Sequence, residues 1–321
     1  MLNQLQINLK KQNYENDFNC KDLTHIVAEI FYIAANALSS QDIYKLSNFY
    51  LNLSKFLNNN FNSFDTLLAE NFYKIDNFDN AKKIYNRIGK KGSAFAWYAA
   101  KQKTKILIYE KKNKEAIKLL RKSFDNLPEK NIYEKYDYAL FLKNNDQFEE
   151  AVRYYTEIIN VINKDHPLYP KVTDGRGVAY ERKGDWKKAE KDLLASLESS
   201  PDQAYVINYL AYSWIEKGIK IEKSLKMLER ANNLKSDDPF IIDSLGWALF
   251  KMKKYVASKN YLQSAVKLMP DDPVINDHYG DVLWKNGKKI QARYYWNYVL
   301  NLDETKDDLR EQIENKLILG L

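Results

Sequence analysis

Hydrophobic residues along this chain recur at the three- and four-residue spacing of amphipathic helices, and small residues recur among them at a longer interval. The small residues stand 34, 35 and 34 positions apart, at Gly177, Ala211, Gly246 and Gly280. Each is followed 12 or 13 positions later by a second small residue, namely Ala189, Ser224, Ser258 and Ala292. Two antiparallel helices cross closely only where one presents almost no side chain to the other, so the pattern predicts a stacked series of two-helix hairpins.

This spacing resembles that of the tetratricopeptide repeat, or TPR, a helical hairpin of about 34 residues. The unit that contains Gly177 has the fullest match, with Trp186 in its second helix and Pro201 after it. The same frame gives eight units in all, which begin near residues 28, 62, 97, 132, 170, 204, 239 and 273. The first four units lack the glycine but keep a small residue in the second helix, as at Ala81 and Ala116.

The frame also divides the chain into parts. Residues 1–27 are rich in Asn, Gln and Lys and are expected to form a lead-in or linker, and residues 28–306 hold the TPR units. Within residues 307–321, Leu309, Ile313 and Leu317 recur at four-residue steps on one face, as in the polar capping helix that a solenoid end requires. The predicted fold class is therefore all-α, a right-handed TPR superhelix (α-solenoid) of about eight hairpins plus a C-terminal capping helix.

Composition and charge narrow the classes of function. No window approaches 18 consecutive apolar residues, so no transmembrane segment is expected. The net charge of +7 comes from Lys and Arg that are spread among 43 acidic residues, and no nucleic-acid-binding motif is present, so no nucleic-acid partner is expected. Cys20 is the single cysteine, which excludes an intramolecular disulfide.

Catalytic and metal-binding patterns are absent from the sequence. The histidines His25, His166 and His278 are far apart, and none has a partner at a metal-ligand spacing. Asp277 and Asp281 are four residues apart around His278 and share a helix face, but two carboxylates without a third ligand are a weak metal signal. We expect this cluster to lie on a solvated or partner-facing surface, and we expect no enzymatic activity, no metal and no cofactor.

In TPR proteins, positions 2, 5, 9 and 12 of each unit face a concave groove, and here position 2 is Tyr205, Phe240 and Val274 in the last three units. Leucines and Trp296 already fill the core positions, so large aromatic residues at the groove positions are expected to be surplus to the core and to bind apolar side chains. Position 5 carries acceptors from Asp174 onwards, which suit the donors of an extended peptide, although solvation of the groove is the simpler alternative. The predicted protein- or peptide-binding groove comprises Asn208, Tyr212, Asp243, Trp247, Phe250, Asp277, Asp281 and Trp284.

A closer resemblance rests on segments in the C-terminal half. They are Val206–Glu216 (VINYLAYSWIE), Ile242–Phe250 (IDSLGWALF), Asp271–Trp284 (DDPVINDHYGDVLW), Gln291–Trp296 (QARYYW) and Lys316–Leu321 (KLILGL). These segments resemble the C-terminal half of bacterial envelope TPR proteins, a family that includes an outer-membrane lipoprotein adaptor of a carboxyl-terminal processing protease. The match is specific over roughly residues 170–321 and looser from residue 28.

The resemblance implies a non-enzymatic scaffold or adaptor that binds a protein or extended peptide, with a protease or its substrates as partner, in envelope protein quality control or assembly. The alternative is a structural module that packs against a missing N-terminal half or against a second copy as a homo-oligomer. Family members are longer and carry a signal peptide, whereas this sequence begins where their central linker lies. We therefore expect a cytoplasmic location if the sequence is complete and a periplasmic or envelope-associated one if it is a fragment.

Overall fold

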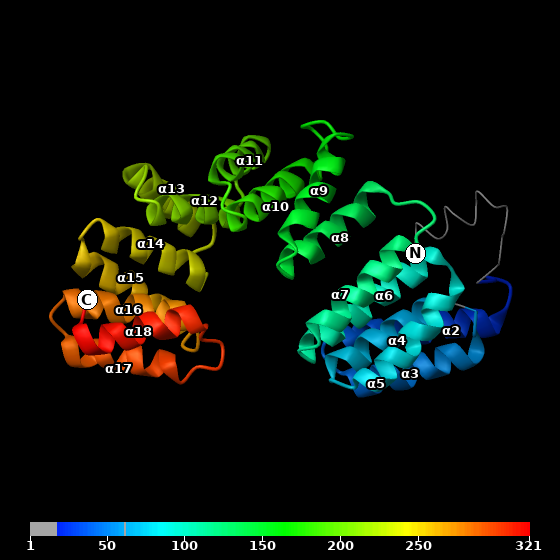
Figure 1. The fold of residues 1–321 in the computed structure, drawn as a ribbon. Helices are drawn as coiled ribbons and strands as arrows, with labels where there is room; N and C mark the ends of the chain where they lie inside the picture. Colours follow the sequence, from blue (N-terminus) through cyan, green and yellow to red (C-terminus); the bar gives the residue numbers. More distant parts are fainter. Residues whose placement is uncertain (1–17, 61) are drawn as a thin grey trace. The chain divides into compact units, whose positions relative to one another are not determined.

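The computed structural model describes residues 18–60 and 62–321, and every regular element within these ranges is a helix (Figure 1). Consecutive helices pair as hairpins: α2 (Leu23–Ser40) with α3 (Tyr44–Leu57), α4 (Asn62–Lys74) with α5 (Phe78–Ile88), α6 (Ser93–Tyr109) with α7 (Asn113–Asp125), α8 (Ile132–Asn144) with α9 (Phe148–Ile159), α10 (Tyr169–Arg182) with α11 (Trp186–Ser199), α12 (Ala204–Glu216) with α13 (Ile221–Leu234), α14 (Pro239–Lys251) with α15 (Tyr255–Leu268), and α16 (Pro273–Lys285) with α17 (Lys289–Leu300). A short 3-10 helix, η1 (Gly89–Lys91), follows α5, and α18 (Asp307–Leu319) ends the chain. The all-α prediction of about eight hairpins with a final helix is confirmed.

The chain forms two compact units, Met1–Tyr154 and Tyr155–Leu321. The first hairpin begins at Leu23, five residues before the unit start expected near residue 28. Residues 1–17 of the expected lead-in lie outside the described residues. Across the part of the chain that the structure describes, no helix combines the length and the apolar character needed to cross a membrane.

The hairpin turns depend on residues in the left-handed backbone region. Gly287, between α16 and α17, has φ 76°, a conformation that glycine adopts without steric cost. The same region is used by Asp42 with φ 61° and by Lys253 with φ 61°, although both carry a Cβ. Because a left-handed residue reverses the chain within a few positions, each second helix returns antiparallel to its first helix.

The two helices of a hairpin cross where each helix carries a small residue. A Cβ added to Gly246 would lie 2.7 Å from the Cγ of Leu262 and 3.2 Å from its backbone nitrogen. At the same crossing the Ser258 hydroxyl donates a hydrogen bond of 2.7 Å to the carbonyl of Gly246, and Ser47 donates one of 2.7 Å to the carbonyl of Ala35 in the first hairpin. The small residues that define the repeat therefore set the distance between its helices.

We predict that Gly246→Val lowers the free energy of unfolding by about 1–3 kcal/mol, because the added methyl groups overlap Leu262 and the facing backbone. Urea unfolding followed by far-UV circular dichroism measures the change. The matched control is Gln263→Val on the exposed side of α15, which should shift stability by less than about 0.5 kcal/mol. Equal unfolding midpoints for the two variants would contradict the close-crossing account.

Candidate protein-binding site

The first helices α12, α14 and α16 follow one another in the second unit, and the starts of α14 and α16 are fixed by matched caps. The Asp238 side chain accepts hydrogen bonds from the backbone nitrogens of Phe240 and Ile241 at 3.1 and 3.2 Å. Asp272 does the same for the corresponding two nitrogens of α16, both at 2.9 Å. A proline follows each aspartate at the first helical position, which suits its fixed φ. Equivalent positions of α14 and α16 are thus held in the same register.

The predicted groove residues divide by burial into two groups. Asp243, Trp247, Asp277 and Asp281 are buried, with exposed fractions of 5%, 8%, 6% and 3%. Asn208, Tyr212, Phe250 and Trp284 are half-buried. The expectation that the aromatic residues are surplus to the core is wrong for Trp247, because the neighbouring first helix covers it.

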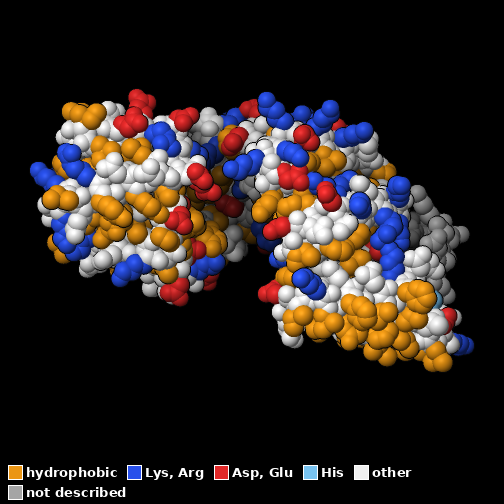
Figure 2. Space-filling model, turned by 90° about the horizontal axis from the view of Figure 1, so that it is seen from below, with side chains coloured by type: hydrophobic (Ala, Val, Ile, Leu, Met, Phe, Trp, Pro, Cys, Tyr) orange, Lys and Arg blue, Asp and Glu red, His pale blue; other side chains and the backbone are white. Residues whose placement is uncertain are grey.

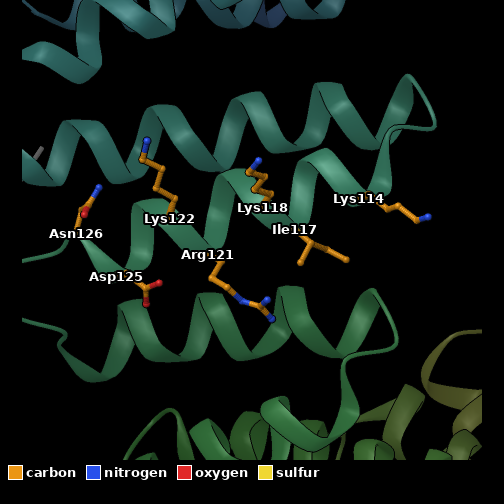
Figure 3. A pocket seen from close by; sticks show the side chains of 7 residues that line it. All are labelled: Lys114, Ile117, Lys118, Arg121, Lys122, Asp125 and Asn126. Carbon is orange, nitrogen blue, oxygen red and sulfur yellow. The ribbon is translucent and has the colours of Figure 1, made fainter.

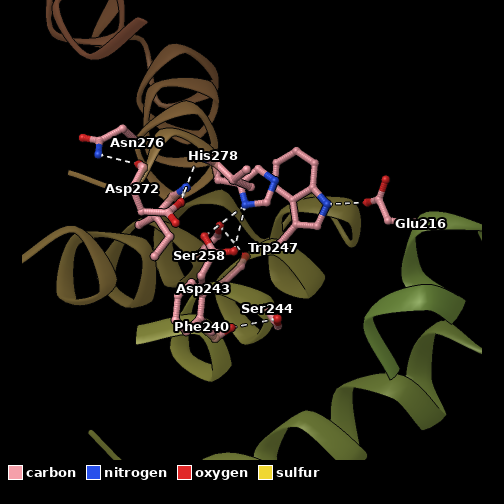
Figure 4. A network of polar contacts seen from close by, with 12 residues as sticks. Glu216, Phe240, Asp243, Ser244, Trp247, Ser258, Asp272, Asn276 and His278 are labelled. Carbon is pink, nitrogen blue, oxygen red and sulfur yellow. Dashed lines mark hydrogen bonds and ion pairs between the residues drawn. The ribbon is translucent and has the colours of Figure 1, made fainter. Parts of the chain in front are cut away.

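A polar and aromatic network links three consecutive first helices (Figure 4). Nδ1 of His278 on α16 lies 3.0 Å from each carboxylate oxygen of Asp243 on α14. The imidazole also stacks on the Trp247 ring, with centroids 3.9 Å apart and planes 11° from parallel. Nε1 of Trp247 donates a hydrogen bond of 2.6 Å to Glu216 at the end of α12. The position-5 carboxylate of one repeat is therefore bound by the next repeat.

The electrostatics of this network favour a charged imidazole. Burial alone lowers the pKa of His278, but the carboxylate of Asp243, assisted by those of Asp277 and Asp281, outweighs burial and raises the pKa above its ordinary value. Metal-ligand spacings in the sequence do not include the partner of His278. Its partner lies 35 positions away, about one repeat, and that spacing is the signal that could have revealed it.

Asp277 and Asp281 are bound from the other side by the C-terminal helix. Nζ of Lys316 on α18 lies 2.6 Å from Asp277 and 2.8 and 2.9 Å from the two oxygens of Asp281. Nε1 of Trp296 donates a further hydrogen bond of 3.0 Å to Asp281. Burial, with the nearby Asp277 charge, raises the pKa of Asp281 to about 6, and Lys316 opposes this rise. The expectation of a solvated surface for these carboxylates is therefore wrong, because they neutralise a half-buried lysine.

The end of the chain also covers Trp284. A Cβ added to Gly320, which has φ 79°, would lie 2.3 Å from the Trp284 ring. Nζ of Lys285 donates a hydrogen bond of 3.1 Å to the backbone carbonyl of Leu321. In the last hairpin, therefore, α18 and the residues after it occupy the surface that the repeat frame assigns to a partner.

A row at the starts of the first helices stays accessible. Tyr205, Phe240 and Val274 occupy the same position in consecutive hairpins and are 55%, 47% and 46% exposed. Beside them, the side-chain oxygen of Asn208 is buried and has no hydrogen-bond partner in the described part of the protein. Burial raises the pKa of the nearby Tyr212 hydroxyl, and the carboxylates of Glu216, Asp243 and Asp277 raise it further.

A different depression, of about 490 Å³, lies along α7 in the first unit (Figure 3). Lys114, Lys118 and Lys122 project from it at four-residue steps, and Arg121 pairs with Glu150 at 2.7 Å. All four cations are exposed to solvent. The depression is therefore an open, solvated helix surface and not an enclosed cavity.

Comparison with known proteins decides the family. The family model for the tetratricopeptide repeat matches residues 79–305. The chain belongs to the tetratricopeptide repeat family. As a TPR protein it is a helical scaffold of the kind that carries protein interactions, and the TPR part of the sequence prediction is confirmed.

Three similar proteins illustrate the extent of the likeness. The chain is 30% identical over 162 residues to the TPR repeat-containing protein PA4667 of Pseudomonas aeruginosa, a match that covers 50% of this chain but only 27% of that protein. TTC0263, a thermophilic TPR protein of Thermus thermophilus, shares the fold with a TM-score of 0.50 at 14% identity, over 59% of this chain and all of its own. MamA from Desulfovibrio magneticus RS-1 matches with a TM-score of 0.46 at 19% identity, over 55% of this chain and 97% of its own.

We predict that Lys316→Met destabilises the docking of α18 by about 3–5 kcal/mol, because it leaves two buried carboxylates without their cation. Hydrogen exchange of the α18 amides measures the effect locally. The control is Lys306→Met at the exposed start of the same helix, which should leave the exchange unchanged. Unaltered α18 protection in the Lys316 variant would contradict a stabilising role for the ion pair.

We predict that the contribution of His278 to stability depends on pH. Its pKa is raised in the folded state, so the stabilisation is fully present below the ordinary value of about 6.5 and is lost as pH rises through the folded pKa. The difference in unfolding free energy between the wild type and His278→Gln should therefore be larger at about pH 5.5 than at about pH 8.5. A difference that grows with pH would show that the imidazole is neutral in the fold.

Proposed function

We propose that this protein is a non-enzymatic scaffold or adaptor that binds an extended segment of another protein along the first helices α12, α14 and α16. The observation that supports this most directly is the exposed row of Tyr205, Phe240 and Val274, repeated at one position of three consecutive hairpins. Exposed apolar groups in a regular row are typical of a binding surface. The half-buried predicted residues Asn208 and Tyr212 lie further along α12, and Phe250 lies near the end of α14.

The spacing of the row suits an extended peptide. Packed helices lie about 8–10 Å apart, and an extended chain in the polyproline II conformation advances about 3.1 Å per residue with three residues per turn. Every third side chain of such a ligand therefore faces the same side and meets one hairpin. Large apolar side chains at that spacing contact Tyr205, Phe240 and Val274.

The partner class follows from the resemblance of the C-terminal segments to envelope TPR proteins. On that basis the proposed partner is a processing protease or one of its substrates, and the proposed process is protein quality control or assembly in the bacterial cell envelope. The location proposed with it is the periplasmic side of the envelope. The Asp243–His278 and Asp281–Lys316 contacts support the non-enzymatic part, because these groups are engaged between helices.

We predict that the Tyr205→Ala, Phe240→Ala double variant loses at least about tenfold in affinity for peptide, because it removes two exposed aromatic anchors. Peptides selected on the wild-type chain from a displayed random library serve as probes, and fluorescence polarisation gives their dissociation constants. These peptides are expected to carry large apolar residues three positions apart.

The control variant is Tyr294→Ala, which removes an aromatic ring that is 67% exposed on α17, away from the first helices. It should bind the selected peptides as the wild type does. Equal binding by the double variant and the wild type would exclude the proposed row, and a library without enriched peptides would exclude recognition of extended segments.

A further inference from the structure

The first hairpin carries an exposed apolar face on both of its helices. We define this N-terminal apolar face as Leu23, Val27 and Ile30 on α2 and Leu46, Phe49 and Phe56 on α3. Their exposed fractions are 76%, 38%, 57%, 44%, 57% and 86%. Hydrophobic side chains gather over this part of the molecule at the lower right of Figure 2. Contiguous apolar surface of this kind is typical of an interaction site.

On α2, Ile30 occupies a repeat position that is buried in every later hairpin. Ile30 is the third residue of its unit, and the third residue of every later unit is buried. These residues are Phe64 at 2%, Ala99 at 2%, Glu134 at 8%, Val172 at 0%, Val206 at 6%, Ile241 at 0% and Ile275 at 1% exposure. Among the residues that the structure describes, none covers the corresponding surface of the first hairpin, so a packing partner of helical form fits it.

On α3, the exposed apolar residues replace polar ones. At the position of Phe49, the next five hairpins carry a cation, namely Lys83, Lys118, Arg153, Lys191 and Lys226. At the position of Phe56 the later hairpins carry Lys90, Asp125, Asn160, Glu198, Asn233, Lys267 and Asn301. One more stacked hairpin would bury Ile30 and leave these α3 positions in water. The apolar side chains of α3 therefore indicate a partner that covers both helices of the hairpin.

The face itself is suited to contact with its own copy. Within α2 the only acidic or basic side chain besides His25 is Glu29, and within α3 the lysines are Lys45 and Lys55. Lys55 is already paired with Asp65 at 2.6 Å. Two copies of the face therefore meet with little like-charge repulsion.

Stacking of the face onto the last hairpin of another copy is obstructed. Lys316 of α18 is bound into the surface of α16, and Gly320 packs against the ring of Trp284, so α18 already covers that end. Two copies can still meet if each contributes its N-terminal apolar face. Such a contact is isologous, and it closes as a dimer.

We propose that the N-terminal apolar face is the interface of a two-fold symmetric homodimer. The interface packs α2 and α3 of one copy against the same helices of a second copy, and it is independent of the peptide-binding row on α12, α14 and α16. A dimer of this kind presents two such rows, which would increase avidity for a partner with two binding segments.

Sedimentation velocity of the full chain across a wide concentration range tests the proposal. We expect reversible dimers in the wild type, and at least about a tenfold increase of the dimer dissociation constant in a Phe49→Lys, Phe56→Lys variant. Lysine is compatible with the fold at both places, since Lys83 and Lys90 occupy them in the second hairpin. Far-UV circular dichroism checks that the variant is folded.

The matched control is Tyr294→Lys, the same repeat position as Phe49 in the last hairpin, where the side chain is 67% exposed. It should leave dimerisation unchanged. Monomers at all concentrations would overturn the proposal, and so would equal dimerisation of the double variant. Polymers that grow with concentration would indicate head-to-tail stacking instead. Monomers that sediment with phospholipid vesicles would show that a membrane surface, and no second copy, covers the face.

Discussion

The close crossing of two helices at paired small residues is the constraint on which this structure depends. At Gly246 the facing Leu262 leaves no room for a Cβ, and Ser258 hydrogen-bonds to the glycine carbonyl. The first hairpin reaches the same arrangement with Ala35 and Ser47. Because this contact sets the register of the second helix on the first, it also determines which residues face the neighbouring hairpins. The burial of each repeat position follows from that register.

The stacking of first helices in the second unit uses charged residues that the repeat frame assigns to a groove. Asp243 binds His278 of the next hairpin, and Asp281 binds Lys316 of the final helix. These buried pairs help specify which helix follows which, a role that buried ionic groups serve in some proteins. In the proposed function, the surface left for a partner is then the exposed start of each helix, together with the half-buried Asn208 and Tyr212.

The fold could be predicted from the sequence because the small residues recur with a constant period and the hairpin is a local structure. The environment of the site could not, since it depends on contacts between repeats. His278 lies one repeat from Asp243, and Lys316 lies 35 positions from Asp281 on a helix whose packing direction the pattern does not give. The repeat frame places the Trp247 ring in the groove for the same reason, because the pattern of a single hairpin does not include the helix of the next hairpin that covers it.

The apolar positions of α3 show the opposite case, in which the sequence held a signal that periodicity alone did not reveal. Phe49 and Phe56 keep the repeat frame, so they do not disturb it, yet they replace side chains that are polar in the next hairpin, where Lys83 and Lys90 stand. Only the exposure of these residues in the folded chain distinguishes the proposed interface from a core. The same comparison of equivalent positions applies to any repeat protein.

The central claim is that the exposed starts of α12, α14 and α16 form the partner-binding surface. A crystal structure of the chain with the tightest-binding selected peptide tests it most directly. The account predicts an extended peptide whose apolar side chains contact Tyr205 and Phe240, with α18 still docked through Lys316. A peptide bound on α7, or one that displaces α18 to reach Asp277 and Asp281, would contradict it.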